Sequence, residues 1–212
     1  LYVHLTLVPY VRTSDQLKTK PTQHSVQKLR EIGIQPDILL CRTEKRLSKD
    51  IKKKIALFCN LEVDSVITAM DVKNVYQVPL ALHEEGLSEI ILEKLGLPVK
   101  EPKLNKWKEI NQKISKPPNE VDIALVGKYV DLKESYKSLT EALGHGGIGN
   151  DLKVNIHWVD AEELEKECGT SLLKKVDGIL VPGGFGERGI EGKINAVNFA
   201  RINMVPYFGI CL

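Results

Sequence analysis

Two apolar segments near the end of the chain each run directly into a glycine turn, and this pair constrains the fold most. Residues 179–186 read Ile-Leu-Val-Pro-Gly-Gly-Phe-Gly, and residues 206–212 read Pro-Tyr-Phe-Gly-Ile-Cys-Leu. A short apolar run before a glycine turn is typical of a buried strand in a parallel sheet. Ligands of such sheets bind beyond the carboxyl ends of the strands, so we expect a site where Gly184 and Cys211 lie.

Cys211 is the candidate nucleophile. A cysteine on a tight strand-to-helix turn is pushed into solvent, as in a nucleophile elbow, and the N-terminus of a following helix would favour its thiolate. Backbone N–H groups of the Gly183-Gly184 loop would stabilise a developing oxyanion by about 3 kcal/mol per donor. A cysteine that only packs in the core is the alternative for a Gly-x-Cys pattern taken alone. The upstream glycine loop favours catalysis.

Strands and helices alternate along the whole chain. We expect strands at residues 3–8, 37–41, 65–68, 121–127, 153–159, 177–181 and 205–210. We expect helices at residues 22–32, 48–58, 75–85, 87–95, 135–143, 161–166 and 190–203. This order favours parallel sheets covered by helices, and the later block reads as the first half of a doubly wound α/β domain.

A change in composition separates two blocks. Four prolines flank an amphipathic stretch at residues 104–114: Pro98, Pro102, Pro117 and Pro118. Prolines around a short helical segment are typical of a linker between domains. We therefore expect domains at residues 1–100 and 120–212, joined by a linker at residues 101–119.

The bulk composition is that of a soluble globular protein. The chain has 212 residues, 42% hydrophobic and 27% charged, with a formal net charge of +2, so nothing calls for nucleic acid or a membrane. No signal peptide begins the chain, and its first residue is Leu1, so we expect an excerpt of a longer protein. Four scattered cysteines without metal-ligand spacing suit free thiols in a reducing cytoplasm.

Three further motifs have open interpretations. Lys18 and Lys20 precede the proline at the start of a predicted helix, which is a good setting for a phosphate chain, although a solvated basic loop is the alternative. The lysines at residues 52–54 are expected to form a mostly solvated face, with at most one turned to a ligand and with Phe58 inward. The glycine-rich residues 144–147 are expected to end a helix and begin a turn.

These motifs, taken in order, resemble the CTP synthase family. Residues 18–26, 33–39 and 54–59 are similar to its synthase domain. Residues 126–129, 135–138, 181–189 and 209–212 are similar to its class I glutamine amidotransferase domain. The Lys-Thr-Lys-Pro-Thr-Gln stretch is specific, since other class I amidotransferases share the elbow but not this loop.

The resemblance implies a fold and a reaction. The fold would be α/β, with the C-terminal part of a Rossmann-like, P-loop-type synthase domain followed by the first half of a doubly wound class I amidotransferase domain. The family aminates UTP to CTP in pyrimidine biosynthesis, using ATP, Mg²⁺ and ammonia from glutamine. GTP activates it, CTP inhibits it by feedback, and it forms cytoplasmic homotetramers.

The resemblance also implies roles for particular residues. Cys211 would attack glutamine, with Gly184 at the glutamine and oxyanion site. The positions similar to the family's UTP and CTP site are Lys18, Thr19, Lys20, Pro21, Thr22, Gln23 and Lys54. Met70, Asp71 and Val72 would lie beside ATP, and Lys137 and Arg188 match positions linked to the GTP effector.

Several parts of the family's machinery are expected outside this chain. The phosphate-binding loop and the Mg²⁺ carboxylates would precede Leu1, and the His and Glu of the cysteine triad would follow Leu212. We therefore expect no metal ligand here, and expect this piece alone to be inactive. Two alternatives stay open: a subunit of another class I glutamine amidotransferase, and a non-catalytic nucleotide-binding assembly module.

Overall fold

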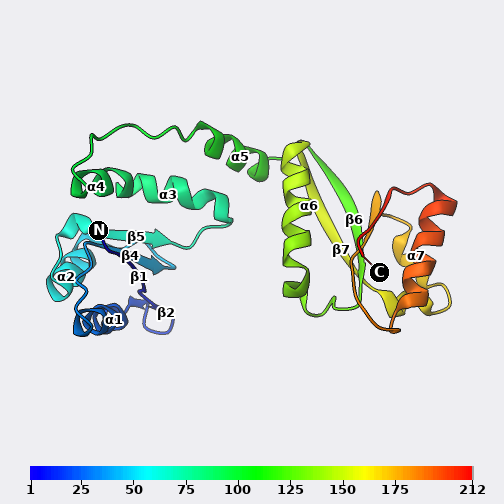
Figure 1. Ribbon diagram of the computed structural model, residues 1–212, viewed down its shortest axis with the longest axis horizontal. Coiled ribbons are helices and arrows are strands. Elements are labelled where there is room, and N and C mark those ends of the chain that lie inside the picture. Colours follow the sequence, from blue (N-terminus) through cyan, green and yellow to red (C-terminus); the bar gives the residue numbers. More distant parts are fainter. Residues whose placement is uncertain (212) are drawn as a thin grey trace. The chain divides into compact units, whose positions relative to one another are not determined.

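A computed structural model describes residues 1–211, and the chain divides into two compact units, one spanning Leu1–Asn111 and one from Gln112 onward (Figure 1). Each unit has a parallel sheet with helices, which confirms the α/β class. The division falls inside the expected linker, within helix α5 (Asn105–Ser115). The domain bounds at residues 100 and 120 stay a prediction. Within residues 1–211, no helix has the length and apolarity needed to cross a membrane.

The first unit is built on a parallel sheet of three strands in the order β1-β4-β5. These strands are β1 (Val3–Leu7), β4 (Ile38–Thr43) and β5 (Val66–Met70). The helices of this unit besides α5 are α1 (Lys20–Glu31), α2 (Lys49–Cys59), α3 (Val78–Glu84) and α4 (Leu87–Lys94). In Figure 1, α1 and α2 lie on one side of this sheet and α3 lies on the other.

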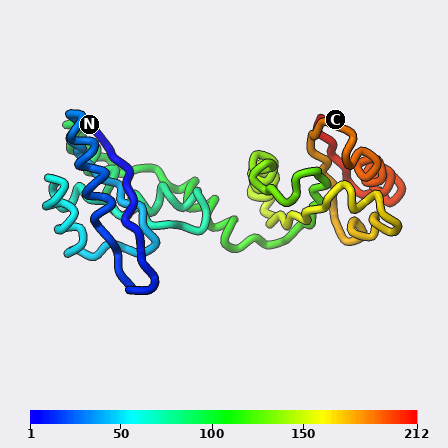
Figure 2. Tube along the Cα trace, turned by 90° about the horizontal axis from the view of Figure 1, so that it is seen from below, coloured from blue at the N-terminus to red at the C-terminus, as the bar shows by residue number. Residues whose placement is uncertain are grey.

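Alternation along β4 gives the two faces of this sheet different roles. Leu39 and Cys41 are fully buried in a core with residues of α1 and α2, such as Val26 and Ile55. Leu40, between them, points to the opposite face, as expected for a pleated strand. A short hairpin of β2 (Tyr10–Val11) and β3 (Gln16–Leu17), not expected from the sequence, connects β1 to α1 and projects beyond their ends in Figure 2.

The second unit is built on a parallel sheet of four strands in the order β7-β6-β8-β9. They are β6 (Asn119–Gly127), β7 (Leu152–Asp160), β8 (Gly178–Val181) and β9 (Tyr207–Gly209). Helix α6 (Lys137–Gly149) and helix α7 (Ile190–Asn203) lie on opposite sides of this sheet (Figure 1).

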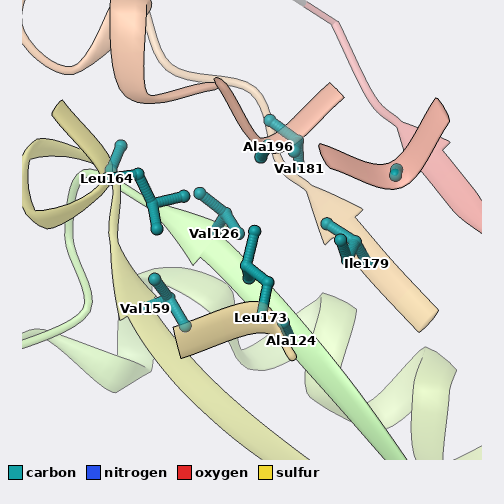
Figure 3. Packing of buried hydrophobic residues seen from close by; sticks show 10 residues of the cluster. Ala124, Val126, Val159, Leu164, Leu173, Ile179, Val181 and Ala196 are labelled. Carbon is teal, nitrogen blue, oxygen red and sulfur yellow. The ribbon is translucent and has the colours of Figure 1, made fainter. Parts of the chain in front are cut away.

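Both faces of β6 are buried. Ala124 and Val126 pack with Ile179, Val181 and Ala196 in the cluster that Figure 3 shows. Leu125 points to the other face, in a cluster with residues of α6 and with Trp158. A strand covered on both faces reads as a continuous apolar run, which is why residues 121–127 could be recognised in the sequence.

Two local predictions are wrong. The glycines at residues 144–147 do not end α6, which continues to Gly149. Gly147 is instead a position where β7 approaches the helix closely. A Cβ there would stand 2.7 Å from the carbonyl oxygen of Leu152, so only glycine leaves room for this approach. Phe58 does not point inward but is 58% exposed, because Ile55 and Cys59 occupy the buried arc of α2.

Lys52 lies on that buried arc and meets Glu85, whose side chain is only 9% exposed. The Lys52 Nζ donates to Glu85 at 2.6 Å, Arg46 donates at 2.9 Å, and the Thr68 backbone N–H donates at 3.1 Å. Burial by itself raises the pKa of Glu85, but the hydrogen bonds from Lys52 and Thr68 outweigh burial and bring this pKa down to about 2. The inward lysine of the 52–54 run therefore has a carboxylate of the same chain as its partner.

Glu85→Gln removes this charge at constant size, and we expect the free energy of unfolding at pH 7 to fall by about 1–3 kcal/mol, because Lys52 and Arg46 lose an anionic acceptor. The native pKa lies below its ordinary value of 4.5, so the stabilisation is present above that pH and is lost as the pH falls toward 2. Urea unfolding at pH 7 and pH 3 measures the difference. The exposed neighbour Glu84 provides the control Glu84→Gln, and equal effects of the two variants at pH 7 would contradict the prediction.

Candidate functional site

The carboxyl ends of three neighbouring strands meet at one edge of the second sheet. Lys128 follows β6, the loop of residues 182–186 follows β8, and Cys211 lies two residues after β9. The chain passes from β6 to β7 on one side and then to β8 on the other, so the strand order reverses beside β6. Such a reversal opens a crevice at the carboxyl edge of the sheet, where ligands of α/β proteins bind.

Cys211 has the geometry expected of an elbow residue. It is exposed, and its φ of 64° lies in the left-handed region that residues other than glycine rarely adopt. Such a conformation costs roughly 1–3 kcal/mol and is found preferentially at functional sites. In the described residues this geometry favours an exposed elbow cysteine over one packed in the core. The helix expected after Cys211 lies outside the described residues, as does Leu212.

Gly183 touches Cys211 directly. A Cβ placed on Gly183 would stand 2.9 Å from the Cys211 Cβ and 3.4 Å from its Sγ. The first of these distances is shorter than real Cβ contacts allow, so this position requires glycine. The structure thus brings the predicted glycine loop and the predicted nucleophile into contact.

A cavity of about 590 Å³ opens beside the cysteine. Its lining includes Gly184, Gly186, Glu187, Lys193, Tyr207 and Cys211. A cavity of this size suits a small molecule. Burial raises the pKa of the Tyr207 phenol, which keeps this side chain neutral at the cavity wall.

Two buried lysines that the sequence did not single out lie behind the glycine loop. Lys128 is 5% exposed and Lys193, on α7, is 8% exposed. Burial, and secondarily the like charge of Lys128, lowers the pKa of Lys193, whereas the Cys211 thiolate opposes this shift. Lys128 lies within residues 126–129, which resemble the amidotransferase domain, but the resemblance gave it no role. A lysine after a strand and a lysine on a helix both look solvent-exposed in a sequence, so the burial of these two side chains could not be predicted.

The residues matched to the GTP effector lie on the same unit. The Arg188 guanidinium donates to the Lys128 carbonyl at 2.7 Å and pairs with Glu162 at 2.9 Å. It also lies 5.7 Å from the centre of the Tyr129 ring. Lys137 begins α6 and is exposed, 3.9 Å from the Glu134 carboxylate. Arg188 therefore contacts the end of β6, whereas Lys137 lies on the first turn of α6.

The residues matched to the ATP site line a cavity of about 510 Å³ in the first unit. Met70, Asp71 and Val72 lie at and beyond the end of β5, and the cavity lies between the α3 face of the sheet and α3 itself. Asp71 pairs with Arg42 at 2.9 Å, and both residues line this cavity. The lining is mostly apolar, which suits a flat aromatic ligand with a few polar contacts.

The segment matched to the UTP and CTP site divides into exposed and structural residues. Lys18, Lys20 and Pro21 are exposed at the N-terminus of α1. Thr22 is fully buried and donates its hydroxyl to the Leu7 carbonyl at 2.9 Å, so it ties α1 to β1.

The remaining residues matched to the UTP and CTP site also include both structural and exposed side chains. The Gln23 amide donates to the buried Thr19 hydroxyl at 3.2 Å, which organises the first turn of α1. Lys54 is exposed on α2. The described residues contain no group of three or more His, Cys, Asp or Glu side chains that could hold a metal ion.

Two family models match the two units. Residues 1–97 match the model described as CTP synthase N-terminus, and residues 131–212 match the class-I glutamine amidotransferase model. With the exposed cysteine against a glycine loop, the second unit is of the class I glutamine amidotransferase type.

Curated relatives that match the whole chain are more specific than the amidotransferase class. A CTP synthase of Geotalea uraniireducens (strain Rf4) is 60% identical over 213 residues, which cover 100% of this chain and 40% of that protein. A CTP synthase of Syntrophus aciditrophicus (strain SB) is 59% identical over 212 residues, which cover 100% of this chain and 39% of that protein. The chain belongs to the CTP synthase family and spans about 40% of the length of the curated relatives it matches.

A solved structure is also similar to part of the chain. It is "Trypanosoma brucei CTPS - glutaminase domain with bound acivicin". The sequences are 43% identical, the match covers 42% of this chain and 35% of that chain, and the TM-score is 0.39.

The four cysteines should differ sharply in reactivity. We expect iodoacetamide at pH 8 to alkylate Cys211 and Cys168 of the native chain at least about 100-fold faster than Cys41 and Cys59, because only a thiolate reacts. Burial raises the pKa of Cys41 to about 12 and that of Cys59 to about 11. Mass spectrometry of digested samples measures each rate, and urea-unfolded chain is the control, in which all four should react. Protection of Cys211 as strong as that of Cys41 would contradict the elbow geometry.

Proposed function

We propose that this chain takes part in the ATP-dependent amination of UTP to CTP, with ammonia taken from glutamine. The observation that supports this most is an exposed Cys211 in a left-handed conformation, held against Gly183. The match of residues 1–97 to the CTP synthase N-terminus disfavours a subunit of a different class I amidotransferase. The strained and exposed thiol disfavours a purely structural elbow.

The proposed chemistry at Cys211 is nucleophilic catalysis. The sulfur attacks the side-chain amide carbon of glutamine, the carbon–nitrogen bond breaks, and ammonia leaves with a proton, so that a glutamyl thioester remains. Water then hydrolyses the thioester to glutamate and the free thiol. N–H groups of the loop at Gly184 would face the oxyanion that forms on the amide oxygen.

The proposed nucleotide sites lie on the first unit. ATP would lie beside Met70, Asp71 and Val72, in the cavity that these residues line with Arg42. UTP, or CTP as feedback inhibitor, would bind at residues 18–23 with Lys54, where exposed lysines stand near the N-terminus of α1. Mg²⁺ would screen the phosphate charge, but it enters through the family alone, and none of its ligands is assigned to the described residues.

The remaining features of the proposal concern regulation and assembly. GTP would act as activator through Lys137 and Arg188, of which Arg188 contacts the end of β6. The full-length protein would form a cytoplasmic homotetramer. The first unit would be the C-terminal part of a Rossmann-like, P-loop-type domain, and the second would be the start of a doubly wound domain, which the reversal of strand order beside β6 supports.

Cys211→Ser tests the proposal in the complete enzyme, meaning the full-length protein in which this chain occurs. We expect glutamine-dependent CTP formation to fall at least about 1000-fold, because a serine hydroxyl without a matched base is a poor nucleophile. CTP formation from an added ammonium salt should stay within about twofold, because it bypasses the thioester. Coupled assays with each nitrogen source measure both, and Cys168→Ser is the exposed-cysteine control. Unchanged glutamine-dependent activity would exclude this role for Cys211.

Gly183→Ala tests the contact between the loop and the cysteine. The added methyl would stand 2.9 Å from the Cys211 Cβ, so the loop or the thiol must move. We expect glutamine hydrolysis by the complete enzyme to fall about 10- to 100-fold, since small misplacements of reacting groups have effects of this size. Gly144→Ala is a matched control within α6, because nothing lies within 4 Å of its Cβ position. If both variants hydrolysed glutamine at the wild-type rate, the contact would have no catalytic importance.

A further inference from the structure

Two buried ammonium groups converge on the backbone of the glycine loop from different elements. Lys193, on the first turn of α7, donates to the Pro182 carbonyl at 3.2 Å. Lys128, directly after β6, donates to the Phe185 carbonyl at 3.2 Å and to the Gly186 carbonyl. The loop that touches Cys211 is therefore anchored near both of its ends by lysine side chains.

Gly184 lies between these two anchors. A Cβ placed there would stand 3.4 Å from the Lys128 Cδ and 3.5 Å from the Lys193 Nζ. Both side chains thus pack against the middle of the loop as well as bonding to its ends. Lys193 also lines the cavity that contains Cys211 and Gly184. The lysines, the loop and the thiol form one connected set.

Stability alone does not account for these lysines. Burying an ammonium group is costly, and a second ammonium nearby adds repulsion, which is reflected in the lowered pKa of Lys193. A methionine of similar length would fill the same space without that cost. Arrangements that cost stability are expected where function requires them.

Peptide geometry connects the anchored carbonyls to N–H groups. A trans peptide is planar, so fixing the direction of a carbonyl fixes the opposite direction of the N–H group on the next residue. Anchoring the Pro182 carbonyl therefore orients the Gly183 N–H, and anchoring the Phe185 carbonyl orients the Gly186 N–H. Glycine has little conformational preference of its own, so a glycine-rich loop depends on such outside contacts.

We propose that Lys193 and Lys128 are positioning residues that hold the loop of residues 182–186 in the conformation needed for attack by Cys211 on its substrate. This proposal rests on the proposed glutamine hydrolysis. The lysines act through the loop backbone, so their loss should change turnover more than substrate affinity.

The test uses Lys193→Met and Lys128→Met in the complete enzyme. We expect kcat for glutamine hydrolysis to fall at least about tenfold, with KM within about threefold, because loop N–H donors act mainly in the transition state. The unfolding midpoint of Lys193→Met should be unchanged or higher, since a buried charge is replaced by an apolar chain. Arg201→Gln, at an exposed position of the same helix, removes one charge as a control and should leave kcat unchanged.

Hydrogen exchange of the loop provides a readout that does not depend on activity. We expect backbone amides of residues 183–187 to exchange at least about tenfold faster in either methionine variant, with the rest of the sheet unchanged. Wild-type exchange rates, or faster exchange with an unchanged kcat, would overturn the proposal. Should Lys193→Met fail to fold, Lys193→Gln and Lys128→Met give the same comparison. Failure of the proposed function is separate, since then wild-type enzyme itself would release no ammonia from glutamine.

Discussion

The parallel pairing of β8 with both β6 and β9 is the constraint on which the site depends. The Ile210 N–H donates to the Val181 carbonyl at 2.9 Å, one residue before Cys211 and one residue before the glycine loop. That bond brings two turns that are far apart in sequence to the same edge and fixes the spacing between Gly183 and the thiol. The short apolar strands matter because they make this register possible, and any slip by one residue would turn Cys211 to the other face of the sheet.

In the first unit, the two faces of the parallel sheet have different roles. Its β4 buries Leu39 and Cys41 toward α1 and α2, which leaves Leu40 and Arg42 facing the cavity beside α3. One face of the sheet therefore supplies stability and the other supplies a ligand-sized space. Glu85, next to the end of α3, is held by Lys52 and by the Thr68 N–H of β5, so the α3 side of the sheet is tied to α2 across the strand. The cavity walls are thereby fixed without filling the cavity.

Much of this arrangement could be predicted from the sequence because it follows from local patterns. Apolar runs before glycine turns predicted the strands of the second sheet, and the helix expected at residues 48–58 forms as α2, where the Ser48 hydroxyl accepts from the Ile51 N–H. The two glycine turns predicted the neighbourhood of Gly183 and Cys211. The predictions that were wrong concerned features that depend on contacts between residues distant in sequence. The end of α6 could not be found, because Gly147 serves the approach of β7 and not a helix stop. The pairing of Lys52 with Glu85 is likewise a tertiary contact that no local pattern encodes.

The burial of Lys128 and Lys193 is another tertiary feature that the sequence does not reveal, and it concerns the candidate site itself. Their burial is decided by the loop that covers them, and a sequence that contains lysine after a strand or on a helix gives no sign of that cover. A charged side chain remains buried only where polar atoms meet it, and here the polar atoms are the carbonyls of the loop beside Cys211. The dependence is mutual, because the carbonyls make the buried lysines tolerable and the lysines give a glycine-rich loop a defined shape. Strand pairing therefore places the loop beside Cys211, and two lysines that act through its backbone hold its shape.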